Sequence, residues 1–206
     1  YSYESLVRLI DNKGNSLAPY KFLDFSKKIK LYSSITKIVV DKACKTFQNR
    51  DENFSINLSV DDIKDLETVD FILKTIKETN TSSRVTFEIL ESEGIENYQE
   101  VISFINQIKS LGARIAIDDF GTGYSNFEHL LRLDVDYIKI DGSLIKNIVT
   151  DDKHRLIVET IVSFAKRIGI KTVAEFVSDE KILQTIKEIG ISCAQGYHIG
   201  KPETLV

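Results

Sequence analysis

The sequence contains no methionine, no tryptophan, two prolines and two cysteines among its 206 residues. Cys44 and Cys193 are too few for a disulfide framework and have no metal-binding spacing, so they fit a reducing cytoplasm. No apolar run approaches the roughly 20 residues that cross a bilayer, and no signal peptide is visible. Because methionine is absent and the chain opens at Tyr1, we expect a fragment or processed product of a larger multidomain protein. A membrane anchor elsewhere in that parent protein stays open.

The sequence also has few histidines and no excess of positive charge. The three histidines, His129, His154 and His198, have neither helical nor strand spacing, which argues against an imidazole metal site; we expect them on the surface or in the core. The formal net charge of −4 does not favour a DNA or RNA polymer as partner, although a local anion site remains open.

A weak repeat of helix, glycine and strand is the strongest internal pattern. Three amphipathic helical segments end in a basic residue followed within three positions by Gly112, Gly169 or Gly190, which is typical of a helix C-terminus. The segment before Gly169 has a predicted apolar stripe of Leu156, Ile157, Ile161, Phe164 and Ile168. A short apolar strand segment follows each glycine, at 113–117, 170–174 and 191–194.

Four further segments, at 3–10, 54–60, 84–90 and 137–140, have the composition of strands, which makes seven in all. Strands that alternate with helices predict a parallel sheet. Seven or more such units in about 200 residues favour a closed (β/α) barrel, and a doubly wound sheet stays an alternative. No linker is evident, so we expect a single domain over residues 1–206.

Polar side chains lie at the ends of these predicted strands, where barrel enzymes place their active sites. Buried carboxylates are costly unless they are paired or metal-bound, so convergent strands would bring together an acidic group that needs a cation. Oxygen ligands favour Mg²⁺, Mn²⁺ or Ca²⁺ over zinc. The candidate ligands are Glu4, Asn57, Glu88, Asp118, Asp119 and Glu175.

Other polar residues accompany the acids. Lys139 and Asp141 share one face of their strand, and Gln195 ends the last strand. Two oxygen-ligated metals suggest in-line displacement at phosphorus, with Lys139 orienting a water or stabilising charge. Glu4 and Arg8 share one face of the first predicted strand. Each residue also has a structural interpretation: Glu4 and Arg8 as an ion pair, either aspartate as a turn cap, and Lys139 as an edge lysine that reaches solvent.

The motifs together resemble the EAL domain family, the bacterial phosphodiesterases of cyclic di-GMP. They occur in family order across essentially the whole chain, and the octet that starts at Asp118 is the most specific of them. The matching segments are Glu4-Ser5-Leu6, Asn57-Leu58-Ser59, Phe87-Glu88-Ile89-Leu90-Glu91-Ser92, Asp118-Asp119-Phe120-Gly121-Thr122-Gly123-Tyr124-Ser125, Lys139-Ile140-Asp141, Val173-Ala174-Glu175 and Gln195-Gly196-Tyr197.

The resemblance implies a modified TIM (β/α)8 barrel that cleaves cyclic di-GMP to linear 5′-pGpG with Mg²⁺ or Mn²⁺ at a two-metal site. Ca²⁺, which prefers longer bonds and more ligands, is expected to inhibit. The implied metal ligands are Glu4, Asn57, Glu88, Asp118 and Asp119.

The resemblance also implies roles for residues around the metals. Glu175 would support the second metal or its water, Lys139 would contact the catalytic water, and Asp141 would hold Lys139 or water in place. Arg8 would bind a substrate phosphate, and Gln195 would lie near the metal and its water shell. The segment from Phe120 to Asn126, anchored by Glu91, would couple metal binding to a homodimer interface. A regulatory or sensor domain is expected on the parent chain.

The chain departs from the family pattern at several points. The family's first strand is absent, Ser5 replaces an alanine, and Phe176 and Ser178 replace a glycine and a glutamate. Ser178 is expected to cap the helix that follows. The alternative to an active enzyme is therefore a domain that binds cyclic di-GMP or a partner protein without cleavage. A barrel whose polar residues are only structural is a third possibility.

Overall fold

The computed structural model describes residues 2–93, 98–121 and 127–204, and it divides into two compact units. The first unit is Tyr1–Phe87 with Asn106–Arg114, and the second is Glu88–Ile105 with Ile115–Val206. Within the described ranges, no helix has both the length and the apolar composition that a bilayer crossing needs.

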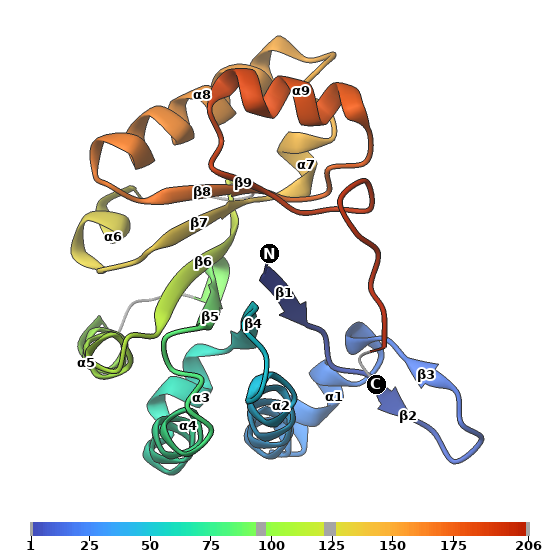
Figure 1. Ribbon diagram of the computed structural model, residues 1–206, viewed down its shortest axis with the longest axis vertical. Coiled ribbons are helices and arrows are strands. Elements are labelled where there is room, and N and C mark those ends of the chain that lie inside the picture. The colour runs from blue at the N-terminus through green and yellow to red at the C-terminus, as the bar shows by residue number, and fades with distance from the viewer. Residues whose placement is uncertain (1, 94–97, 122–126, 205–206) are drawn as a thin grey trace. The chain divides into compact units, whose positions relative to one another are not determined.

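The first unit contains the strand order β1-β4-β5, with helices after the strands. β1 pairs in parallel with β4, and Glu4 is in register with Ser55. Helices α2 and α4 lie side by side, and α2 packs on β4 (Figure 1). The elements are β1 (Ser2–Ser5), β2 (Leu9–Ile10), β3 (Ser16–Leu17), η1 (Pro19–Lys21), α1 (Leu23–Lys28), α2 (Tyr32–Phe47), β4 (Asn53–Leu58), α3 (Val60–Lys64), α4 (Leu66–Glu78) and the first half of β5 (Val85–Leu90).

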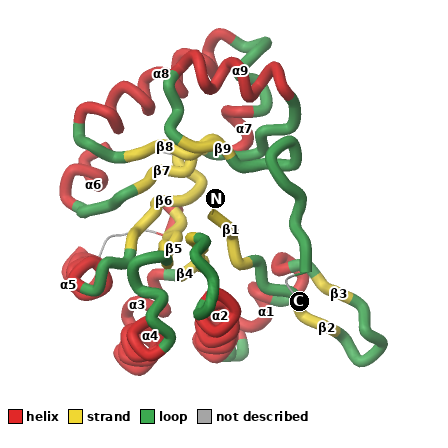
Figure 2. The backbone as a smooth tube through the Cα atoms, viewed as in Figure 1, coloured by secondary structure: helices red, strands yellow, loops and turns green. Residues whose placement is uncertain are grey.

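The second unit continues from β5 in the order β5-β6-β7-β8-β9. β7 pairs in parallel with β6 and β8, and β8 pairs in parallel with β9. Figure 2 shows α8 and α9 along one side of β7, β8 and β9. The elements are η2 (Glu91–Glu93), α5 (Tyr98–Ser110, shared with the first unit), β6 (Arg114–Phe120), α6 (Phe127–Arg132), β7 (Tyr137–Ile140), α7 (Gly142–Ile145), α8 (Asp152–Arg167), β8 (Lys171–Ala174), α9 (Glu180–Ile189) and β9 (Cys193–Ala194).

The four parallel pairs confirm the predicted parallel sheet with intervening helices. The three repeat glycines also behave as predicted, since Gly112, Gly169 and Gly190 all have φ between 80° and 88° after a helix. Glycine has no Cβ, so it adopts the left-handed conformation at little energetic cost. Each of these glycines therefore ends its helix and turns the chain into the next strand.

The prediction of one strand over 3–10 is wrong. β1 ends at Ser5, and Leu9–Ile10 instead pairs antiparallel with Ser16–Leu17. The turn between them is held by Asp11, whose carboxylate accepts the N–H groups of Lys13 and Asn15 at 2.8 Å. A local turn therefore redirects a stretch whose composition suited a single strand.

Helix faces are set by which apolar residues reach the core. In α2, residues Thr36, Val40, Ala43, Cys44 and Phe47 are buried, which is a regular stripe.

In α8 the predicted stripe is partly wrong. Leu156 and Ile157 are exposed, whereas Val158, Ile161 and Val162 are buried. Leu156, Ile157 and Val158 are consecutive apolar residues in α8, so the sequence did not single out which of them packs.

Strand β4 ends where a capping box begins α3. The Ser59 hydroxyl accepts the N–H of Asp62 at 3.2 Å, and the Asp62 carboxylate accepts the Ser59 N–H at 3.2 Å. The same carboxylate accepts the hydroxyl of Thr36 at 3.0 Å, all within a buried site. The box therefore fixes the chain two residues after Asn57.

We predict that Ser59→Ala lowers the free energy of unfolding by about 1–2 kcal/mol, because it removes a helix cap and a partner of buried Asp62. Urea denaturation followed by circular dichroism measures the change. Ser34→Ala is the matched control, since Ser34 is exposed on α2 and should change stability little. Equal stability of the two variants would contradict the role of the box.

Candidate functional site

Lys139 lies at the centre of a cluster of acids in the second unit. Its Nζ atom is 2.8 Å from Glu88 Oε2, 3.0 Å from Asp118 Oδ1 and 3.0 Å from Glu175 Oε1. Only 2% of Lys139 is exposed, and the three acids are buried too. The alternative interpretation, in which Lys139 reaches solvent from an edge strand, is therefore wrong, because three carboxylates hold the side chain inside.

The strands β5, β6, β7 and β8 deliver these four side chains. Glu88 lies within β5, Asp118 within β6 and Lys139 within β7, while Glu175 directly follows β8. Adjacent parallel strands bring such positions to one edge, and the neighbouring apolar residues of each strand anchor it in the core. The structure thus brings together four residues that the sequence singled out separately.

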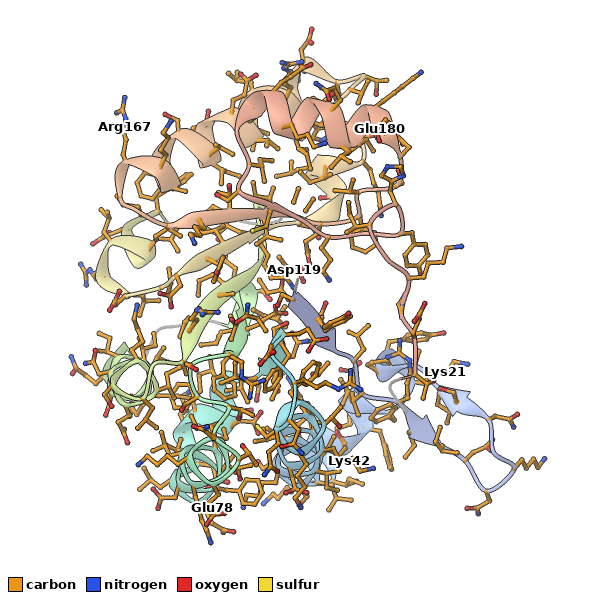
Figure 3. The ribbon with its side chains drawn as sticks, in the orientation of Figure 1. Lys21, Lys42, Glu78, Asp119, Arg167 and Glu180 are labelled. Carbon is orange, nitrogen blue, oxygen red and sulfur yellow. The ribbon has the colours of Figure 1, made fainter. Side chains whose placement is uncertain are left out.

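A bulge in β6 allows two consecutive aspartates to face the cluster. Ile117 pairs with Ile138 and Phe120 with Ile140, so β6 has one more residue than β7 in this interval. Asp119 has a left-handed φ of 54°, a conformation that aspartate tolerates better than most residues. Side chains of a regular strand alternate faces, whereas the bulge re-aims Asp119. Figure 3 labels Asp119 where β6 ends.

Crowding of these carboxylates raises two of their pKa values. Burial, followed by the charges of Asp118 and Asp141, raises the pKa of Asp119 to about 6. Burial also raises the pKa of Glu175 to about 7, with Lys139 opposing it and Asp118 adding to it. The single positive charge of Lys139 therefore does not balance the negative charges of the carboxylates around it.

Asp141 is held by the chain that follows it. Burial alone would raise its pKa, but hydrogen bonds with Ser143, Asp119 and the Gly142 N–H together lower it. Its carboxylate accepts the Ser143 N–H at 2.8 Å and caps α7. Asp141 thus remains ionised beside the more easily protonated Asp119.

The donor set of this cluster fits a divalent cation. One carboxylate oxygen from each of Asp118, Asp119 and Glu175 lies within 4.8 Å of the others. These are hard oxygen donors of the kind that Mg²⁺ and Mn²⁺ prefer. The raised pKa values of Asp119 and Glu175 mean that their ionised forms lack stabilising positive charge, which a divalent cation would supply. This supports the prediction of a metal site in this part of the chain.

Glu91 lies at the end of β5 and binds the start of the segment after β6. Its Oε2 atom accepts the N–H of Gly121 at 3.1 Å. The predicted dimerisation segment runs from Phe120 to Asn126, of which 122–126 lies outside the described residues. The role of Glu91 as an anchor and the dimer both stay predictions.

Gln195 is placed by a close approach of two backbone segments. The Gln195 carbonyl accepts the N–H of Val177 at 3.0 Å, and the Gln195 N–H donates to Ala174 at 2.8 Å. A Cβ on Gly196 would lie 2.3 Å from the nitrogen of Val177, so only glycine fits there. The Gln195-Gly196 motif therefore fixes the chain beside the end of β8.

Glu4 and Asn57 meet in the first unit. The Asn57 amide donates to Glu4 Oε1 at 2.9 Å across the β1–β4 pair. Arg8 lies beyond β1, is exposed, and donates to the carbonyl of Val7 at 2.9 Å. Glu4 and Arg8 therefore do not share a strand face, because β1 ends at Ser5. Metal and phosphate roles for these three residues stay predictions.

The prediction that Ser178 caps α9 is wrong. The N-cap is Asp179, whose carboxylate accepts the Ile182 N–H at 3.1 Å, and the Ser178 hydroxyl donates to that carboxylate at 3.0 Å. The hydrogen bond from Ile182 also lowers the pKa of Asp179. A carboxylate is a stronger acceptor than a hydroxyl, so the residue one position later took the cap.

We predict that Lys139→Met lowers the free energy of unfolding of the metal-free protein by about 3–5 kcal/mol, because it leaves buried carboxylates without their ammonium. Thermal unfolding in a chelator measures this change, and Mg²⁺ should restore part of it. Lys42→Met, at an exposed position on α2, is the control and should change little. Equal stability of the two variants would refute the central place of Lys139.

The pH dependence of stability has a predicted sign. Since the folded-state pKa values of Glu175 and Asp119 lie near 7 and 6, the folded chain holds more protons than the unfolded chain from about pH 4.5 to 7. Stability in chelator should therefore fall as pH rises through this window, and the melting temperature should be higher at pH 5.5 than at pH 8. Mg²⁺ should reduce the difference. A melting temperature that rises with pH in chelator would contradict the raised pKa values.

Comparison with known proteins identifies the family. The EAL domain model matches residues 1–202. The chain is 36% identical over 208 aligned positions to the cyclic di-GMP phosphodiesterase PdeB of Shewanella oneidensis, covering 98% of this chain and 24% of that protein. It is 32% identical to the cyclic di-GMP phosphodiesterase PdeF of Escherichia coli, covering 99% of this chain and 28% of that protein. The chain thus spans about a quarter of the length of these curated relatives.

Solved structures agree with this. The chain aligns with the MucR phosphodiesterase in complex with c-di-GMP at a TM-score of 0.89 and 29% identity, covering 97% of this chain and 83% of that chain. It aligns with the EAL domain of FimX from Pseudomonas aeruginosa, bound to c-di-GMP, at a TM-score of 0.92 and 23% identity, covering 98% and 84%. These likenesses confirm the predicted modified TIM-barrel fold class. With its match over residues 1–202, the chain belongs to the EAL domain family.

Proposed function

We propose that this chain hydrolyses cyclic di-GMP to linear 5′-pGpG with the help of Mg²⁺ or Mn²⁺. The observation that carries the proposal is the buried cluster of Lys139 with Glu88, Asp118 and Glu175, next to Asp119. Relatives named as cyclic di-GMP phosphodiesterases align over nearly the whole chain, which supports the choice of substrate.

The proposed metal ligands follow from the cluster and from the motifs. Asp118 and Asp119 are assigned to a two-metal site, with Glu175 supporting the second metal or its water, on the strength of their shared position. Glu88 is assigned to the first metal with Asp118. The assignment of Glu4 and Asn57 to that metal rests on their sequence motifs alone. When bound, the metals supply Lewis acidity that lowers the pKa of water and stabilises charge on the phosphate.

The protein's own residues would manage the protons and the orientation of the reacting water. Water attacks phosphorus, the bond to the 3′ oxygen breaks, and the products are a 5′ phosphate and a 3′ hydroxyl. Glu175, whose carboxylate lies 3.0 Å from the Lys139 ammonium, would accept the proton of the attacking water. Lys139 orients that water and stabilises charge that develops on the phosphate.

The remaining proposed roles surround this centre. Asp141 holds Asp119 and the nearby water in place, and Gln195 borders the water shell. Arg8, exposed in this structure, binds a substrate phosphate. Glu91 anchors the segment through which the protein forms a homodimer. A regulatory domain on a longer, cytoplasmically exposed parent protein completes the proposal, in keeping with relatives that are about four times as long.

A second candidate function is binding of cyclic di-GMP without cleavage. Two observations favour it: Phe176 and Ser178 depart from the family pattern directly after Glu175. In that case the acidic cluster would hold a metal and ligand but turn over slowly.

We predict that the purified protein converts cyclic di-GMP to the linear dinucleotide with Mg²⁺ or Mn²⁺, measured by chromatography. Glu88→Gln and Glu4→Ala should each lower the rate at least a hundredfold, because each removes a charged ligand of the proposed site. Glu78→Gln, at an exposed position on α4, is the control for Glu88→Gln and should keep the wild-type rate. Replacing Mg²⁺ by Ca²⁺ should stop turnover.

Binding without product would select the receptor function. Unchanged rates in Glu88→Gln and Glu4→Ala would refute the ligand assignment. Absence of both binding and product would reject both candidate functions.

A further inference from the structure

Phe176 has a backbone conformation that an aromatic residue rarely adopts. Its φ is 55°, in the left-handed region, and it directly follows Glu175 of the acidic cluster. This conformation is strained for a bulky residue, and such outliers gather at functional sites. Glycine at this position would be free of the strain. We therefore expect the side chain of Phe176 to have a function that offsets it.

The ring of Phe176 contacts residues at the two ends of α7. A Cβ on Gly142 would lie 2.2 Å from Cδ2 and 2.5 Å from Cγ of Phe176, so the ring packs directly on the glycine backbone at the start of α7. The Nζ atom of Lys146, at the end of α7, lies 4.2 Å from the ring centroid. Gly142 and Lys146 therefore fix the position of the ring beside Asp141 and Glu175.

The ring is nevertheless exposed. Phe176 keeps 54% of its surface accessible, although it lies immediately after a residue that is only 7% exposed. A strained, positioned and exposed aromatic ring gains little for the fold, since most of its apolar surface stays in water. It presents a flat π surface at the edge of the sheet where the acidic cluster lies.

We propose that Phe176 and Lys146 form a nucleobase subsite that binds one guanine of the substrate. This rests on the proposed function, in which the ligand is a cyclic dinucleotide. The base stacks on the Phe176 ring, and the ammonium of Lys146 moves from the ring to the base edge. There it donates hydrogen bonds to the O6 and N7 acceptors that guanine presents.

The subsite explains why Gly142 is required and what the strain at Phe176 supports. Any side chain at position 142 would displace the ring from its place. The arrangement also assigns two different tasks to the two residues: Phe176 supplies stacking for any base, and Lys146 distinguishes guanine from adenine, which carries a donor in place of O6.

The test measures equilibrium binding of fluorescently labelled cyclic di-GMP in Ca²⁺, where turnover is suppressed. Phe176→Leu, which keeps apolar bulk but removes the π surface, should weaken binding roughly five- to hundredfold. Phe176→Trp should bind within about threefold of wild type, since it keeps a stacking surface. The affinity for Mn²⁺, measured by calorimetry, should stay unchanged in both variants, because neither touches the acidic cluster.

Lys146 has its own measurement in the same assay. Lys146→Met should weaken binding of cyclic di-GMP at least fivefold and binding of cyclic di-AMP less, because adenine shares only the N7 acceptor. Lys42→Met, at an exposed position on α2, should bind both ligands as wild type does.

Wild-type affinity in Phe176→Leu would overturn the subsite, as would a parallel loss of Mn²⁺ affinity, which would mean that Phe176 acts through the acids. Equal losses for the two dinucleotides in Lys146→Met would overturn its part. The proposed function fails separately: wild-type protein that binds cyclic di-GMP but yields no product with Mg²⁺ would reject hydrolysis and leave the subsite supported.

Discussion

The second unit depends on the ion pairs that the Lys139 ammonium forms with buried carboxylates. It contacts three buried carboxylates within 3.0 Å, and each of these comes from a different strand or strand end. Burial of so many acids is unfavourable unless positive charge accompanies them. The raised pKa values of Asp119 and Glu175 show that one ammonium does not suffice. The excess of buried negative charge therefore destabilises the fold and also makes the cluster suitable for a divalent metal.

The bulge in β6 converts this imbalance into a ligand geometry. Without it, Asp118 and Asp119 would point to opposite faces of the sheet, and only one would join Glu175. With the extra residue and the left-handed φ of Asp119, oxygens of both aspartates lie within 4.8 Å of each other and of Glu175. Asp141, fixed by Ser143 at the start of α7, then adds a charge that keeps Asp119 easily protonated.

Much of this site was predictable from the sequence because strand patterns repeat every two residues. Apolar neighbours on both sides of Glu88 and Lys139 marked these as inward polar groups, and the glycines after three helices marked the strand starts. The bulge was not predictable, since it depends on how many residues β7 offers opposite β6. The burial of Leu156 was predicted wrongly, because exposed and buried apolar residues of α8 look alike in sequence. The cap of α9 fell to Asp179 rather than Ser178 because two adjacent capping residues competed for one position.

We propose that the acids around Lys139 hold divalent metal. The most direct measurement is an anomalous difference map from crystals of the protein soaked in Mn²⁺. We predict strong peaks at coordination distance, about 2.0–2.3 Å, from carboxylate oxygens of Asp118, Asp119 and Glu175. A map with Mn²⁺ bound elsewhere, and with Lys139 still in contact with all three of its acids, would contradict it.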